Sequence, residues 1–114
     1  MLASETATSS VELQYTFLDA ASSQPETINA FQFSLYDFDF GVDGNGRECM
    51  SIGGYDQYHL TSSTEVVVSA DTAVAGATVF CATTRGYGAD NPEDPQALTQ
   101  QQKDRSVMLS LIHI

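Results

Sequence analysis

The sequence has no tryptophan, only four basic residues and no long apolar run. Fifteen acidic residues outnumber the basic ones, and the formal net charge is -11. Nucleic acids and anionic membranes are bound through basic side chains, so we expect neither as a partner. A membrane-spanning helix needs about 18 apolar residues in succession, and we therefore expect no membrane insertion. The acidity itself suits cation binding, a saline environment or simple solubility.

Cysteine is also scarce, since Cys49 and Cys81 are the two present and they form no C-x-x-C motif. A structural zinc site needs about four ligands, so we do not expect one built on cysteine. Two alternatives remain open for the pair. They form one disulfide, which requires an oxidising compartment, or they are free thiols that pack as small hydrophobic residues.

The length of 114 residues, 42% of them hydrophobic, is enough for one core and too small for two. We expect residues 1–9, rich in Ser, Thr and Ala, to be a linker, and residues 10–111 to form one domain. The N-terminal stretch lacks the basic and apolar regions of a signal peptide. We expect an extracellular or cell-surface protein. Because such a protein carries its signal peptide in front of its domains, we also expect this chain to be part of a longer one with neighbouring domains. Residues 110–114 end in mid-strand without polar residues and are expected to be a non-native tail.

Alternation of apolar and polar residues is the main structural signal and predicts an all-β fold. Strands are predicted at residues 11–17, 30–40, 48–52, 57–60, 65–70, 77–84 and 106–111. Thr99 is a candidate N-cap for one short helical turn near residues 96–104. Seven or eight short strands separated by Gly, Pro and Asn turns favour a single antiparallel β-sandwich, jelly-roll-like in topology.

A first cluster of acidic residues follows the second predicted strand, in the stretch YDFDFGVDGNGRE. Its carboxylates lie around a glycine-rich loop and are candidate calcium ligands, because calcium takes six to eight oxygens in flexible geometry: Asp37, Asp39, Asp43 and Glu48. The alternative is that these carboxylates face solvent after a bulge, while Phe38 and Phe40 take over the core face. Both interpretations stay open at this point.

A second acidic cluster occupies the late loop GADNPEDP. Its two prolines fix backbone angles and stiffen the loop. Asp90 and Asn91 are candidate ligands for the same cation if this loop meets Asp37 and Asp39 at one end of the domain. Asp94 is more simply explained as a cap for the turn that follows.

These two stretches resemble a type of uncharacterised extracellular β-sandwich module found in marine protists and bacteria. The resemblance lies in the Tyr-Asp-Phe-Asp strand end at residues 36–39 and the Gly-Ala-Asp-Asn-Pro loop at residues 88–92. It implies an extracellular β-sandwich and no known activity.

Exposed aromatic and basic residues are the remaining candidates for ligand binding. Tyr55 and Tyr58 follow a Gly-Gly turn, and Arg85 and Tyr87 lie in a loop with two glycines. Such side chains contact sugars and protein surfaces, although tyrosines in a sandwich also pack half-buried. We therefore expect a non-catalytic, calcium-stabilised module that binds a glycan or a surface protein. The alternatives are a small carbohydrate-active enzyme with paired carboxylates and a structural spacer without a ligand.

Overall fold

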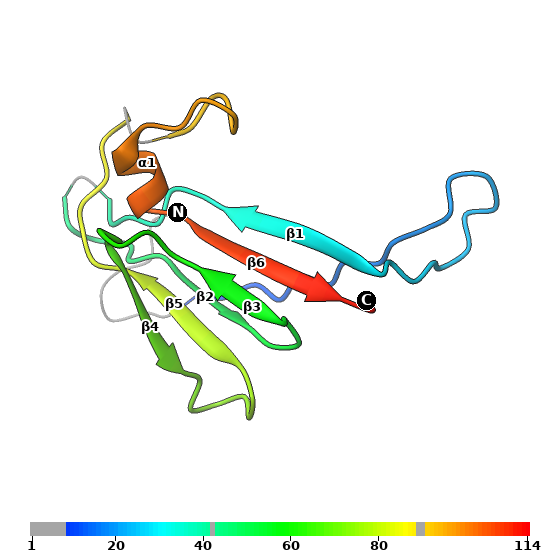
Figure 1. Cartoon of the computed structure of the whole chain (residues 1–114). Helices are drawn as coiled ribbons and strands as arrows, with labels where there is room; N and C mark the ends of the chain where they lie inside the picture. Colours follow the sequence, from blue (N-terminus) through cyan, green and yellow to red (C-terminus); the bar gives the residue numbers. More distant parts are fainter. Residues whose placement is uncertain (1–8, 42, 89–90) are drawn as a thin grey trace.

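The computed structural model describes residues 9–41, 43–88 and 91–114, and these form six strands and one short helix (Figure 1). The elements are, in order, β1 (Ala30–Leu35), β2 (Cys49–Ile52), β3 (Gln57–His59), β4 (Val66–Ala70), β5 (Thr78–Ala82), α1 (Gln100–Asp104) and β6 (Val107–Ile112). They make two antiparallel three-stranded sheets, with strand orders β1-β6-β3 and β2-β5-β4. The predicted all-β class is confirmed.

One hydrophobic core joins the two sheets. Phe80 in β5 and Leu109 in β6 are fully buried, and Val66 in β4 is 5% exposed. The alternating residues of β1 pack against this core from the first sheet, as their spacing predicts: Phe31, Phe33 and Leu35. Both sheets therefore contribute inward-facing side chains to one apolar centre.

Helix α1 connects the end of β5 to β6 and begins where the sequence predicts. Thr99 is its N-cap and forms a capping box with Gln102, in which each side chain bonds the other residue's backbone N–H. Arg105 ends the helix, is 4% exposed and donates from Nε to Glu65 Oε2 at 2.7 Å. This ion pair, in which Arg105 is buried and Glu65 is half-buried, holds the C-terminal end of α1 to the chain that leads into β4.

Two predictions about the strands are wrong. The described residues contain six strands, not seven or eight, because residues 11–17 do not form one. A strand requires a hydrogen-bonded neighbour, and the backbone of residues 11–16 has no hydrogen bond to another element in the described structure. Val11 is 79% exposed and Leu13 is 67% exposed, so this part of the alternation is not buried.

The alternation of β1 also stops earlier than residue 40. Asp37 has a φ of 68°, in the left-handed region that few non-glycine residues adopt. This turn exchanges the two faces of the chain, so Phe38 is 5% exposed and enters the core while Asp37 is half-buried beside it. Phe38 thus takes over the core face, as one of the two alternatives held. Phe40, which that alternative also placed in the core, is half-buried and lies outside the core cluster.

Residues 110–112 belong to the sheet, and residues 113–114 continue beside the chain that leads into β1. β6 continues to Ile112, and Ile28 and Ile114 exchange backbone hydrogen bonds of 2.7 and 3.0 Å. The last residues therefore extend the pairing of β6 with the chain that leads into β1.

Candidate functional site

Two loops far apart in sequence are joined at one end of the molecule. Phe40 N donates to Thr84 O at 2.8 Å, and Gly86 N donates to Phe40 O at 2.8 Å. These bonds make a parallel bridge between Phe40 and Arg85. The loop after β1 and the loop after β5 therefore form one surface, which we call the loop end and define by its described residues, 36–41, 43–48, 84–88 and 91.

Asp37 and Asn91 meet across this surface. With its amide nitrogen facing the carboxylate, Asn91 donates to both oxygens of Asp37, at 2.8 Å to Oδ1. Gln102 Nε2 of α1 donates to Asn91 O at 3.4 Å, and Phe38 N donates to Arg105 O at 3.0 Å. Helix α1 and its C-cap Arg105 therefore help to position both partners of the contact between Asp37 and Asn91.

Asp39 lies directly against the backbone of Gly86. A Cβ atom at position 86 would come within 1.8 Å of Asp39 Oδ2. Gly86 is buried, and its N–H is part of the bridge to Phe40. Glycine at this position is required because the carboxylate occupies the space that any side chain would need. The sequence pattern Arg-Gly-Tyr-Gly signalled a loop at this point and did not signal this contact.

Asp43 is held by its own turn and by a basic side chain. Asn45 N donates to Asp43 Oδ1 at 3.0 Å, and Asn45 Nδ2 donates to Oδ2 at 3.1 Å. These bonds, and to a smaller degree the charge of Arg85, hold the pKa of Asp43 below its ordinary 3.8. The Arg85 guanidinium lies over Gly44, where Nη2 is 3.2 Å from the position of a Cβ. A cation at Asp43 would compete with this guanidinium.

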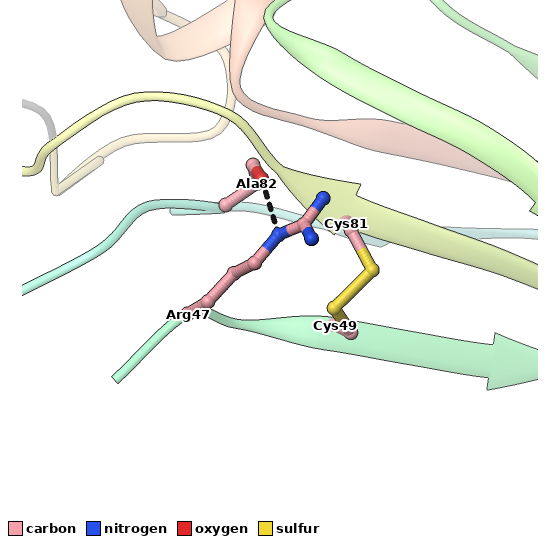
Figure 2. Close-up of a disulfide and its surroundings, with 4 residues drawn as sticks. All are labelled: Arg47, Cys49, Cys81 and Ala82. Carbon is pink, nitrogen blue, oxygen red and sulfur yellow. Dashed lines mark hydrogen bonds between the residues drawn. A yellow bond between two sulfur atoms is a disulfide. The ribbon is translucent and has the colours of Figure 1, made fainter. Parts of the chain in front are cut away.

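The base of the loop end is fixed by covalent and polar contacts (Figure 2). Cys49 and Cys81 form a disulfide with a Cα–Cα distance of 4.1 Å, between directly paired residues of β2 and β5. Arg47 Nε donates to Ala82 O at 2.9 Å beside this bridge. The disulfide alternative for the two cysteines is therefore confirmed. The bridge fixes the point at which the loop after β1 leads into β2.

A shallow polar depression of about 330 Å³ adjoins Asn91. The depression is lined by Gly88, Asn91, Glu93, Asp94, Ala97, Thr99 and Gln102. The polar residues among them supply carboxylate, amide and hydroxyl groups. Groups of this kind exchange hydrogen bonds with polar ligands such as sugar hydroxyls. Glu93 belongs to the second acidic cluster but was not among the predicted site residues. Gln102 was missed because it reaches the site through its turn of α1.

The other predicted site residues are distributed unevenly. Tyr87 is 63% exposed and belongs to the loop end, as does the exposed Glu48 at the start of β2. Asp90 lies outside the described residues. Tyr55 and Tyr58 lie elsewhere, with rings packed 6.4 and 5.2 Å from that of Phe80. The Tyr55 hydroxyl also bonds Thr78 Oγ1.

Two further findings concern metal-binding groups and membrane-spanning helices. Within residues 9–41, 43–88 and 91–114, no three His, Cys, Asp or Glu side chains gather closely enough to hold a metal ion. No helix in the described part of the chain is long and apolar enough to cross a membrane. Asp37 and Asn91 are two predicted ligands that the fold brings into contact.

Comparison with known proteins adds no assignment. Neither the protein-family models, nor the curated proteins, nor the solved structures contain a match to this chain.

Proposed function

We propose that this chain is a non-catalytic extracellular or cell-surface module that binds a glycan or a surface protein through its loop end. The observation that carries the proposal is the contact between Asp37 and Asn91, which joins two polar loops into one surface. Tyr87, 63% exposed, offers an aromatic face on the same surface. The depression next to Asn91 supplies hydrogen-bonding groups.

The architecture proposed for this module is a β-sandwich with jelly-roll-like connections. Support comes from the core, to which β4 and β5 of one sheet and β6 of the other contribute buried side chains. The ring of Tyr58 in β3 lies 5.2 Å from that of Phe80 in β5, which is an edge-to-face contact between the sheets. A rigid sandwich that presents loops at one end is a common scaffold for recognition.

Calcium is proposed as a stabilising ligand of the loop end. Asp37 and Asn91 supply oxygens from two loops, and a cation between them would reverse the Asn91 amide so that Oδ1 faces inward. Water or the ligand would complete the coordination. The -11 charge of the chain favours a divalent cation over an anion at this surface.

An extracellular location is proposed because the Cys49–Cys81 disulfide is compatible with an oxidising compartment.

The rival function is a carbohydrate-active enzyme with Asp37 and Asp39 as its carboxylates. Such an enzyme needs one carboxyl group with a raised pKa as its acid. Asp37 accepts hydrogen bonds from the Asn91 amide, and Asp39 packs against the backbone of Gly86. These contacts favour a structural role for both carboxylates over a catalytic one.

Melting curves with calcium and with a chelator test the cation. A ligand at 100 times its Kd stabilises the folded state by about 2.7 kcal/mol, so calcium should raise the Tm and the chelator should reverse the change. Asp37→Asn should abolish the effect, whereas Asp71→Asn, at the far end of β4, should retain it. An unchanged midpoint in calcium would refute this part of the proposal.

A glycan array with the calcium-loaded protein tests the binding function. We expect bound glycans to be recovered uncleaved, and Tyr87→Ala to weaken binding. Val74→Ala removes an apolar side chain that is 55% exposed in the turn between β4 and β5, and it serves as the control. Cleavage of a bound glycan would instead establish the enzyme, and equal loss with both variants would place the site elsewhere.

A further inference from the structure

Residues 11–17 carry a strand pattern, but in the described structure the backbone of this segment is paired at Phe17 alone, whose carbonyl accepts from Glu26 N at 2.9 Å. Apolar residues alternate with polar ones from Val11 to Phe17. The backbone of residues 11–16 has no hydrogen bond to another element, and Val11 and Leu13 remain largely exposed. A period-two pattern of this length is the signature of a strand with one buried face.

The second half of this segment is already anchored on the inner side of β1. The rings of Phe17 and Phe31 lie 4.7 Å apart, and those of Tyr15 and Phe33 lie 5.7 Å apart. Phe31 and Phe33 are the β1 residues that face the core. Residues 15–17 therefore lie in the layer of the second sheet, opposite β1, and Figure 1 draws their trace passing behind β6.

The positions of the strands indicate which neighbour this segment has. In the first sheet β6 lies between β3 and β1. Tyr58 of β3 lies over Phe80 of β5, and residues 15–17 lie over β1. In the second sheet β2 is next to β5, and Figure 1 shows it on the side toward β6 and the N-terminal trace. The position beyond β2 is therefore the one opposite β1.

The outer edge of β2 has bonding groups to offer. Ala82 N donates to Glu48 O at 2.9 Å, which makes 48 and 82 a hydrogen-bonded pair and Cys49 and Cys81 a non-hydrogen-bonded pair. The N–H and C=O of Cys49 and Ser51 therefore point away from β5. β2 pairs with β5 alone among the strands of the described chain.

We propose that residues 11–17 are a strap that closes onto the free edge of β2 as a seventh strand. Closure would pair the outward groups of Cys49 and Ser51 and would bury Val11 and Leu13 against the core side of β1. The occupant is this chain's own segment, because Tyr15 and Phe17 already hold it beside the edge at high effective concentration. The exposed apolar residues of the strap then need no external partner.

Backbone hydrogen exchange at Cys49 and Ser51 tests the closed strap. In a closed strap these two amides exchange slowly. Leu13→Asp should speed their exchange at least about tenfold, because it places a charge on the face that closure buries. Gln14→Asp adds the same charge on the opposite face and should leave the exchange unchanged.

Two results would overturn the proposal. Amides of Cys49 and Ser51 that exchange in the wild type as fast as those of an unstructured peptide would show an open edge. Protection that disappears on dilution would show pairing with a second copy instead. If Leu13→Asp does not fold, nuclear Overhauser contacts between the wild-type backbones of residues 12–16 and 49–51 decide, and their absence contradicts the strap.

Discussion

At the scale of single residues, the loop end depends on the close approach of the Asp39 carboxylate to Gly86. Because a Cβ at position 86 would lie 1.8 Å from Asp39 Oδ2, Gly86→Ala must displace the carboxylate or separate the loops. We expect a loss of about 1–3 kcal/mol in unfolding free energy, as for other overpacked sites. Urea unfolding measures it.

Gly88→Ala is the matched control for this substitution. Among the described residues, chain neighbours aside, no atom lies within 4 Å of the Cβ position at Gly88, so a change within about 0.5 kcal/mol is expected. Equal effects of the two substitutions would mean that the contact with Asp39 does not limit position 86.

Asp104 is the residue for which the structure predicts a dependence of stability on pH. The Thr61 hydroxyl, with Gln100 and Ser63, holds its pKa below the ordinary 3.8. A lowered folded-state pKa stabilises the protein above the unfolded-state value, and this stabilisation is lost as the pH falls through the folded-state pKa. Asp104→Asn should therefore reduce stability at pH 7 and flatten the loss in acid.

Unfolding in urea at a series of pH values from neutral to below 3.8 checks this prediction. Asp56→Asn, on the exposed turn before β3, is the control and should follow the wild type. An Asp104→Asn curve parallel to that of the wild type would contradict the assigned role of Asp104.

One residue also shows why the site was only partly predictable. Period two correctly predicts that Phe31 and Phe33 face the core, because alternation is a property of any extended chain. It fails at Asp37, whose positive φ reverses the faces. Aspartate adopts this conformation less often than glycine, so residue type alone does not mark the position.

At the scale of elements, the β2–β5 pair depends on its disulfide. The bridge closes a loop with a sequence separation of 32 residues, which corresponds to about 3–4 kcal/mol of stabilisation through the unfolded chain. The double variant Cys49→Ala, Cys81→Ala should lose about this amount in chemical unfolding. A reductant should lower the stability of the wild type and leave the double variant unchanged, and no difference between the two oxidised proteins would contradict the assignment.

The elements that the sequence predicted well are those with local signals. Thr99 and Gln102 form the capping box that begins α1, and the strands after residue 48 are separated by clear turn residues. Residues 11–17 have the pattern without the pairing, because hydrogen-bonded neighbours depend on the tertiary arrangement of the sheets. The strap proposal accounts for this difference.

At the scale of the whole molecule, the fold brings together the loops that carry the two acidic clusters of the sequence. Sequence places the clusters around Asp37 and Asp90 more than fifty positions apart, and the contact of Asn91 with Asp37 brings their loops together. Two basic residues also act here, Arg47 at the base and Arg85 over Gly44. The sequence could name both loops but not their meeting, because the bridge between Phe40 and Arg85 is a backbone contact without a sequence signature.

Amide chemical-shift mapping tests the central claim that the loop end is the ligand-binding surface. The labelled protein would be titrated first with calcium and then with the soluble forms of the glycans that it bound on the array. The account predicts shifts concentrated in the loop end, and their loss in Asp37→Asn. Shifts centred on Tyr55 and Tyr58, or no shifts with either addition, would contradict it.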